Sequence, residues 1–248
     1  MAAHSTASSL DLSIIEQAVS RRVRELGLPP RARILDAPCG AGALTASLRA
    51  DGYDARGADI SAEAGNRLGN AFAIADLTRP LPWPDAFFDA ALSVEGIEHL
   101  ENRHGFLREL CRVLRAEGLL VLTTPNIVSV RSRVRFGASG FFHHDPRPLR
   151  EAAPHPLHHI GLMTFPELRY ALHSSGFRIV HVAATHFKPV SYLYSVLVPW
   201  MWLYSRIAFR KERDAAQRHA NVEIRSALFS RALLFGENVM VTARVAQL

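Results

Sequence analysis

The sequence is poor in cysteine and in lysine. Its 248 residues include two cysteines, Cys39 and Cys111, so the chain cannot build the disulfide framework of a small secreted domain, and a cytoplasmic location is expected. The first thirteen residues contain neither a basic segment nor an apolar run, so they do not resemble a secretory signal. Hydrophobic residues make up 48% and charged residues 21%, which excludes a disordered or fibrous chain. The sequence therefore predicts a globular protein with room for one large domain or two small ones.

The positive charge is carried almost entirely by arginine. Lys188 and Lys211 are the only lysines among 29 basic residues, and the formal net charge is +6. Such a charge permits a nucleic acid or an anionic membrane as a partner but requires neither. The histidines are unevenly spread, since five of the 12 fall between His143 and His159.

Apolar runs of strand length alternate with helical patterns along most of the chain. Strands are predicted at residues 33–37, 53–59, 72–75, 88–94, 119–123, 177–183 and 239–245, and helices at 14–26, 42–50, 62–68, 103–114 and 166–175. This alternation predicts an α/β fold with a doubly wound sheet. Residues 125–156, which are rich in arginine, histidine, glycine and proline, are expected to be irregular.

The chain divides into three parts. Residues 1–10 are small and polar and are expected to form a disordered tail. Residues 11–187 and 236–248 are expected to form the α/β domain. Residues 188–235 are expected to form an apolar and basic helical insert before the last strand.

A loop with two glycines follows the first predicted strand. It reads DAPCGAG from Asp36 to Gly42, and a helix follows. Glycine lets the backbone approach a ligand closely, and the amino end of a helix offers free N–H groups. Sheets of this type bind ligands beyond the carboxyl ends of their strands, so the loop is predicted to bind a nucleotide-like cofactor. A plain tight turn is the alternative, and a dinucleotide site is disfavoured because the third glycine of G-x-G-x-x-G is absent.

Acidic residues stand at the ends of the next two predicted strands. Asp59 ends the second strand, where a carboxylate can accept hydrogen bonds from both ribose hydroxyls. Asp76 follows the third strand, where it can hold the amino group of a base. Each alone is better explained as a helix cap or a solvated acid. Their order along three successive strand ends favours a nucleoside-binding role.

Four segments then occur in a characteristic order: ILDAPCGAGALT, GADIS, ADLTRPLPWPDAFFDAALSVEGIEHL and LRELCRVLRAEGLLVLTTPN. They resemble the successive motifs of class I S-adenosylmethionine-dependent methyltransferases. The resemblance covers residues 34–182 and the last strand. It implies a Rossmann-like, mostly parallel sheet of seven strands with a reversed last strand, and S-adenosylmethionine as the cofactor.

The same resemblance implies which residues contact the cofactor. They are Asp36, Gly40, Gly42, Asp59, Asp76, Leu77 and Ser93. The first three would surround the methionine part, Asp59 would hold the ribose, and Asp76 with Leu77 would hold the adenine. Pro38 departs from the family, because many members have glycine there. Proline fixes a backbone dihedral and removes a donor, so it is expected to shape the loop without closing the site.

A second set of residues has side chains of the kind that bind metals. The fourth predicted strand ends in E-x-x-E-H, formed by Glu95, Glu98 and His99, which share one face if the chain is helical there. Two carboxylates and an imidazole suit a divalent ion such as Mg²⁺ or Mn²⁺. In the alternative interpretation the glutamates only face the positive end of a helix dipole.

A later histidine segment strengthens the metal interpretation. Residues 155–164, HPLHHIGLMT, follow TTPN. With E-x-x-E-H they resemble the metal-dependent small-RNA 3′-terminal 2′-O-methyltransferases, and the E-x-x-E-H element is also similar to that of ubiquinone-biosynthesis O-methyltransferases. The resemblance implies Glu95, Glu98, His99 and His159 as metal ligands, and an ion can chelate two adjacent oxygens and activate one of them. The RNA enzymes continue with an aromatic-acidic-tryptophan element, from which residues 160–163 (IGLM) depart.

The insert begins with a long uncharged stretch. Residues 190–205 hold two of the three tryptophans and three of the five tyrosines, and Arg206, Arg210, Lys211 and Arg213 follow. Tyrosine and tryptophan favour the membrane interface and arginine attracts anionic lipid, so one interpretation is an element that binds a membrane surface or a lipid tail. A buried helix or a homodimer interface is the other.

The sequence predicts a methyltransferase that acts on a hydroxyl oxygen of a small-molecule, saccharide or lipid-linked acceptor. His99 or His159 is the candidate base that removes the hydroxyl proton. Arg131, Arg133 and Arg135 either meet an anionic group of the acceptor or form a solvated charge run. RNA 2′-O-methylation is one alternative, disfavoured because no RNA-binding module is visible. A non-catalytic S-adenosylmethionine-binding protein is the other.

Overall fold

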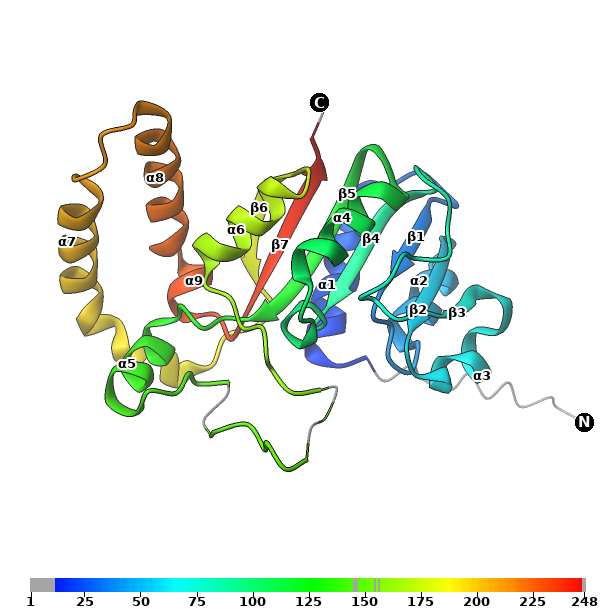
Figure 1. Ribbon diagram of the computed structural model, residues 1–248, viewed down its shortest axis with the longest axis horizontal. Helices are drawn as coiled ribbons and strands as arrows, with labels where there is room; N and C mark the ends of the chain where they lie inside the picture. The colour runs from blue at the N-terminus through cyan, green and yellow to red at the C-terminus, as the bar shows by residue number, and fades with distance from the viewer. Residues whose placement is uncertain (1–11, 145–146, 154, 156, 247–248) are drawn as a thin grey trace, which may run out of the picture.

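The computed structural model describes residues 12–144, 147–153, 155 and 157–246, so the predicted tail at residues 1–10 lies outside the described residues. A seven-stranded sheet forms the centre, with helices on both faces (Figure 1). The strands are β1 (Arg33–Asp36), β2 (Asp54–Asp59), β3 (Phe72–Ile74), β4 (Phe88–Val94), β5 (Leu114–Pro125), β6 (Phe177–Ala184) and β7 (Asn238–Val245). Their order is β3-β2-β1-β4-β5-β7-β6, and β7 runs antiparallel to β5 and β6. The prediction of a doubly wound, mostly parallel, Rossmann-like sheet is confirmed.

Two hydrophobic cores lie on the opposite faces of this sheet. The helices that cover the faces are α1 (Ile14–Glu25), α2 (Ala43–Ala50), α3 (Gly65–Leu68), α4 (Arg103–Val113) and α6 (Phe165–Ser174). Successive side chains of a strand point to opposite faces. Ile34 therefore packs with Val19 and Leu48 on the side of α1 and α2, whereas Leu35 packs with Phe106 on the side of α4 and α6.

Capping residues fix where helices α1 and α6 begin. Ser13 and Glu16 form a capping box at α1, each side chain bonding the backbone N–H of the other. Thr164 and Glu167 form the same box at α6, directly after the histidine segment. The capping box therefore fixes the start of α6 at the end of the histidine segment, residues 155–164.

The structure departs from the predicted elements in three places. Residues 130–139, expected to be irregular, form helix α5 (Val130–Ser139), because the Ser129 side chain caps its start and the left-handed Gly140 ends it. Strand β5 begins at Leu114 rather than at residue 119. The predicted helix at 62–68 is divided into short turns, namely η1 (Ala62–Ala64), α3 and η2 (Gly69–Ala71).

The insert is helical, as predicted. It contains η4 (Pro189–Leu197), α7 (Val198–Phe209), α8 (Ala215–Leu228) and α9 (Arg231–Phe235). Figure 1 shows α7 and α8 side by side beyond the β6 edge of the sheet, with α7 as the outer helix. Among the helices in the described part of the chain, none combines the length and apolar character needed to span a bilayer.

Candidate functional site

The turn between β1 and α2 contains two glycines in the left-handed conformation. Gly40 has a φ of +50° and Gly42, the N-cap of α2, has a φ of +77°. The N–H of Gly40 donates a 2.8 Å hydrogen bond to Oδ2 of Asp59, which holds the turn against the end of β2. A Cβ at Gly42 would lie 2.9 Å from Cδ1 of Leu68. Both the backbone conformation and the close packing therefore favour glycine at position 42.

A cavity of about 700 Å³ lies at the carboxyl ends of β1, β2 and β4. Its lining includes five of the seven residues predicted to contact the cofactor, namely Asp36, Gly40, Asp59, Asp76 and Leu77. The other two lie outside the lining, since Gly42 packs against α3 and Ser93 is fully buried. Glu95 and His99 also line the cavity, so the predicted cofactor and metal residues meet in one space.

Asp36 is a buried carboxylate at the end of β1. The hydroxyl of Thr45 donates a 2.6 Å hydrogen bond to its Oδ2. Burial raises the pKa of Asp36 to about 7, although the Thr45 hydrogen bond acts in the opposite direction. A cationic group in the cavity would favour the charged form, so this carboxylate is suited to bind a cation.

The carboxylates of Asp59 and Asp76 are positioned by hydrogen bonds from nearby loops. Asp59 accepts from the N–H of Gly40 at 2.8 Å and from the N–H of Ser61 at 2.9 Å. Asp76 accepts from the N–H and the hydroxyl of Thr78, and these bonds lower the pKa of Asp76. Each carboxylate oxygen can accept more than one hydrogen bond, so both acids can also bind a ligand.

Two close contacts behind the loop were not foreseen from the sequence. Pro38, which follows a cis peptide bond, packs against Gly96, where a Cβ would lie 2.3 Å from Cδ of the proline. Sγ of Cys39 lies beside Gly57, where a Cβ would be 2.7 Å away. The glycines themselves were the available signal, because glycine near a strand often marks a close approach of another segment.

The segment after β4 is not a regular helix. Glu95 has a φ of +47°, and a single turn, η3 (Ile97–His99), follows it. Glu95, Glu98 and His99 therefore do not share one helix face, which corrects that expectation. The left-handed backbone at Glu95 separates this residue from the turn that carries the other two.

The structure brings three of the four predicted metal ligands together. One ligand atom from each of Glu98, His99 and His159 lies within 4.8 Å of the others. Nδ1 of His99 lies 3.1 Å from the carbonyl oxygen of His158, which directs Nε2 toward other ligands. The N–H of Gly161 donates a 2.8 Å hydrogen bond to the carbonyl of Glu98, so the histidine segment is held against η3.

Glu95, the fourth predicted ligand, is held separately. Its Oε2 accepts a 2.6 Å hydrogen bond from Nδ2 of Asn238, and its N–H donates to the hydroxyl of Thr123 at 3.1 Å. Among the described residues, Oε1 of Glu95 and Oε1 of Glu98 are buried and have no hydrogen-bond partner. Burial raises the pKa of both carboxyl groups, and the charge of Glu95 raises that of Glu98 further. Such a pair is suited to take up a cation or a proton.

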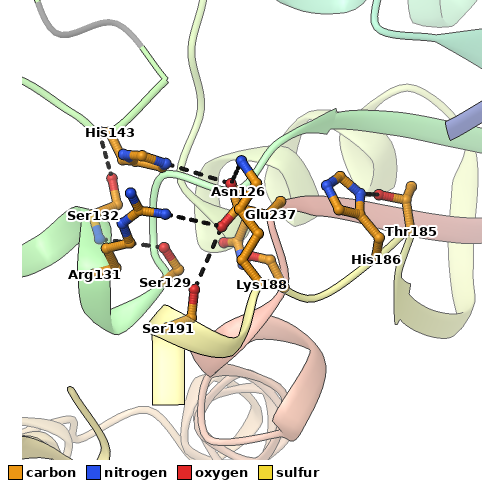
Figure 2. A network of polar contacts seen from close by, with 11 residues as sticks. Asn126, Ser129, Arg131, Ser132, His143, Thr185, His186, Lys188, Ser191 and Glu237 are labelled. Atoms are coloured by element: carbon orange, nitrogen blue, oxygen red, sulfur yellow. Dashed lines mark hydrogen bonds and ion pairs between the residues drawn. The ribbon is translucent and has the colours of Figure 1, made fainter. Parts of the chain in front are cut away.

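Glu237 lies just before Asn238 and connects the insert to the domain, as Figure 2 shows. This residue is only 4% exposed. Its carboxylate lies 2.9 Å from Nζ of Lys188, 3.4 Å from Oγ of Ser191, 3.5 Å from Nη1 of Arg131 and 3.4 Å from Nε2 of His143. Burial acts to raise the pKa of Glu237, but the Lys188 ammonium and the neighbouring groups hold it below its usual value.

Two of the three arginines predicted to face an anion are engaged inside the protein. Arg131 pairs with Glu237, and Nε of Arg133 donates a 2.6 Å hydrogen bond to the carbonyl of Val128. Arg135 is exposed in the middle of α5. Of the three arginines, it is the one that fits the alternative of a solvated charge on the surface.

Residues 12–182 match the family described as a methyltransferase domain, and this stretch contains the cavity and the three clustered ligand residues. The chain belongs to this family. Membership supports S-adenosylmethionine as the cofactor of the cavity.

Individual relatives match shorter stretches. A probable S-adenosylmethionine-dependent methyltransferase of Mycobacterium tuberculosis is 47% identical over 49 residues, which cover 20% of this chain and 18% of that protein. A demethylmenaquinone methyltransferase of Tropheryma whipplei is 36% identical over 123 residues, which cover 46% of this chain and 52% of that protein. The chain thus spans about half or less of the length of these relatives.

A solved structure matches over nearly the whole chain. The S-adenosylmethionine-dependent methyltransferase from Archaeoglobus fulgidus has a TM-score of 0.56 at 17% identity, over 92% of this chain and 94% of that one. At this identity the match shows a shared fold.

Proposed function

We propose that the protein transfers the methyl group of S-adenosylmethionine to a hydroxyl oxygen of a small-molecule, saccharide or lipid-linked acceptor, in the cytoplasm or at the adjoining membrane surface. The observation that carries this proposal is the group of Glu98, His99 and His159, of which His99 lines the cofactor cavity. Binding the cofactor does not call for such a group. A hydroxyl acceptor does, because its proton must leave and its oxygen must be aligned with the methyl group.

The cofactor side of the reaction is assigned to the acids that line the cavity. Asp36 would hold the methionine part through the cationic amino group. Asp59 would accept hydrogen bonds from the ribose hydroxyls, and the N–H groups of Gly40 and Ser61 hold its carboxylate in place. Asp76 and Leu77 bind the adenine. Held by these residues, the cofactor would supply an activated methyl group to an acceptor bound beside η3.

The donor set of Glu98, His99 and His159 fits a divalent ion, since it combines a carboxylate with two imidazoles and includes a buried carboxylate oxygen without a partner. Mn²⁺ or Mg²⁺ bound there would supply a Lewis acid for two neighbouring acceptor oxygens. Neighbouring groups of the chain orient the side chains of Glu98 and His99. The hydroxyl of Thr124 holds Glu98 at 3.1 Å, and the carbonyl of His158 holds the ring of His99.

His99 and His159 are also the groups that would take the hydroxyl proton. The carbonyl of His158 accepts the hydrogen on Nδ1 of His99, which leaves a lone pair on Nε2. That nitrogen can serve either as a ligand or as a base. The two roles predict different responses to a chelator, and the activity assay below distinguishes them.

C-methylation of a quinol-type ring is a second candidate. It has a specific basis, since the similar Tropheryma whipplei protein is a demethylmenaquinone methyltransferase. An RNA acceptor has weaker support, because Arg131 and Arg133 are engaged inside the protein.

The test is labelled S-adenosylmethionine incubated with the protein and cell extract, which is then split into lipid, polar small-molecule and RNA fractions. We expect label in the first or second fraction, released by ether-cleaving acid, and lost with a chelator or in Glu98→Ala and His159→Ala. Acid-stable label favours C-methylation, and label in RNA favours the RNA alternative. Labelling that survives both the chelator and the substitutions contradicts the metal. Cofactor binding without turnover in any fraction indicates a non-catalytic binding protein.

A further inference from the structure

Helix α7 and the end of η4 expose large apolar side chains to an unusual degree. No residue of α7 is buried. Trp200 is 73% and Tyr204 76% exposed, and Leu193 and Val196 in η4 are 76% and 73% exposed. Scattered apolar residues on a surface are ordinary, but a contiguous group of this size marks an interaction site.

The same insert accounts for most of the net positive charge of the protein. Residues 188–235 contain eight basic and three acidic residues, so their net charge of +5 accounts for nearly all of the +6 of the chain. Arg206, Arg210, Lys211 and Arg213 follow the apolar face directly. Among the residues that the structure describes, no acidic side chain forms an ion pair with any of these four. The guanidinium of Arg206 instead lies 5.3 Å from the centre of the Trp202 ring.

We infer that α7 and the basic segment after it dock on the surface of an anionic lipid bilayer. Tryptophan and tyrosine side chains favour the boundary between lipid tails and headgroups, and nearby arginine and lysine side chains attract anionic headgroups. The twelve residues of α7 extend about 18 Å, which suits a helix that lies along this boundary.

The charge distribution argues against a second copy as the occupant. A symmetric dimer places the same patch of each subunit in contact. Pairing through α7 would bring Arg206, Arg210 and Lys211 of both copies into one interface. No acidic residue occurs within η4 or α7 to offset them, so like charges would oppose the pairing.

The insert is attached to the domain beside the candidate site. Lys188 and Ser191, at its start, both contact Glu237 (Figure 2). The next residue, Asn238, donates to Glu95 in the cavity wall. Docking through α7 would therefore set the orientation of the cavity relative to the bilayer. The inference extends the proposed function to acceptors taken from a membrane, but lipid binding itself does not depend on that function.

The test is vesicle flotation of the full chain. Phosphatidylcholine vesicles containing phosphatidylglycerol are compared with vesicles of phosphatidylcholine alone. We expect the protein to float with the anionic vesicles, at least about tenfold more weakly with the neutral ones, and more weakly as salt is raised. Trp200→Ser with Tyr204→Ser removes the apolar contact and should weaken binding at least about tenfold. Tyr170→Ser, at a 70% exposed tyrosine on α6, is the matched control and should float like the wild type.

Two double charge-reversal variants test the electrostatic contribution to lipid binding. Arg210→Glu with Lys211→Glu should abolish the preference for anionic vesicles, whereas Arg21→Glu with Arg31→Glu changes the net charge equally at exposed positions outside the insert and should retain it. Circular dichroism and S-adenosylhomocysteine binding show that each variant is folded, and they also report failure of the cofactor site separately from failure of docking. The inference is overturned if the wild type does not float or if the Trp200 and Tyr204 variant floats like the wild type. It is also overturned if the wild type is a dimer that this variant converts to a monomer without a change in lipid binding.

Discussion

The candidate site has two halves, and the contacts that hold each half differ in how far apart in the sequence their residues lie. In the cofactor half, formed by the loops after β1, β2 and β3, Asp36 bonds Thr45 and Asp76 bonds Thr78. In the acceptor half, formed by the η3 segment, His159 and the start of β7, Asn238 bonds Glu95 across more than a hundred residues of sequence. The cofactor half is thus held mainly by motifs that are close in sequence, whereas the acceptor half joins residues that are far apart in the sequence.

The largest expected effect is in the cofactor half. Asp59→Ala removes the proposed ribose ligand and leaves the N–H groups of Gly40 and Ser61 without their acceptor. Two hydrogen bonds to a charged group account for a loss of at least about 100-fold in affinity for S-adenosylhomocysteine, measured by calorimetry. Asp54→Ala removes an acid that pairs only on the surface and serves as the control. A loss below about tenfold for Asp59→Ala would remove this residue from the site.

In the acceptor half, substitutions at Glu98 and at Glu95 should have different effects on metal affinity. Glu98→Ala removes a member of the clustered group, and we expect Mn²⁺ affinity to fall about 10- to 100-fold while S-adenosylhomocysteine binding is kept. Glu95→Gln should have the smaller effect, because Glu95 is outside the clustered group and one of its carboxylate oxygens is bonded to Asn238. Electron paramagnetic resonance of free Mn²⁺ measures both. Equal losses in the two variants would place Glu95 among the ligands after all.

The hydrogen bond between Asn238 and Glu95 joins the start of β7 to the site. Asn238→Ala leaves Oε2 of the half-buried Glu95 without its donor, so the free energy of unfolding should fall by about 1–3 kcal/mol. Urea unfolding measures this change. Asn221→Ala, which breaks an exposed side-chain contact on α8, is the control and should change stability little. An equal loss in the two variants would show that the Glu95 contact carries no special weight.

The same difference in range explains what the sequence could predict. Strand order, the two-glycine loop and the acids at successive strand ends follow from patterns within a few residues, and five of the predicted cofactor residues line the cavity. Glu237 and Asn238 carry no such pattern. Their partners, Arg131, Lys188 and Glu95, become neighbours only through the antiparallel placement of β7 beside β5. A shared helix face for Glu95 and Glu98 depended on the chain being helical there, and spacing alone does not reveal the left-handed backbone at Glu95.

The smallest expected effect is a pH-dependent change in stability caused by Asp36, in the cofactor half. Burial raises the pKa of Asp36 from its ordinary value of 3.8 to about 7, so the folded protein favours the neutral carboxyl. The stability linked to this proton is fully present below pH 3.8 and is lost as the pH rises through about 7. Asp36→Asn removes the loss, so this variant should gain on the order of 1 kcal/mol or more over the wild type at pH 8 and less at pH 5, measured by urea unfolding.

Cofactor binding by this variant should change in the opposite direction, because a cationic amino group favours the charged carboxylate. Wild-type affinity for S-adenosylhomocysteine should therefore rise as the pH passes through about 7, and the affinity of Asp36→Asn should be weaker and nearly flat over the same range. Thr45→Val removes the hydrogen bond to Asp36 but keeps the charge, and is the matched control. If affinity stays independent of pH in the wild type, Asp36 does not meet a cation, and the cofactor half is held together by Asp59 and the loop backbone alone.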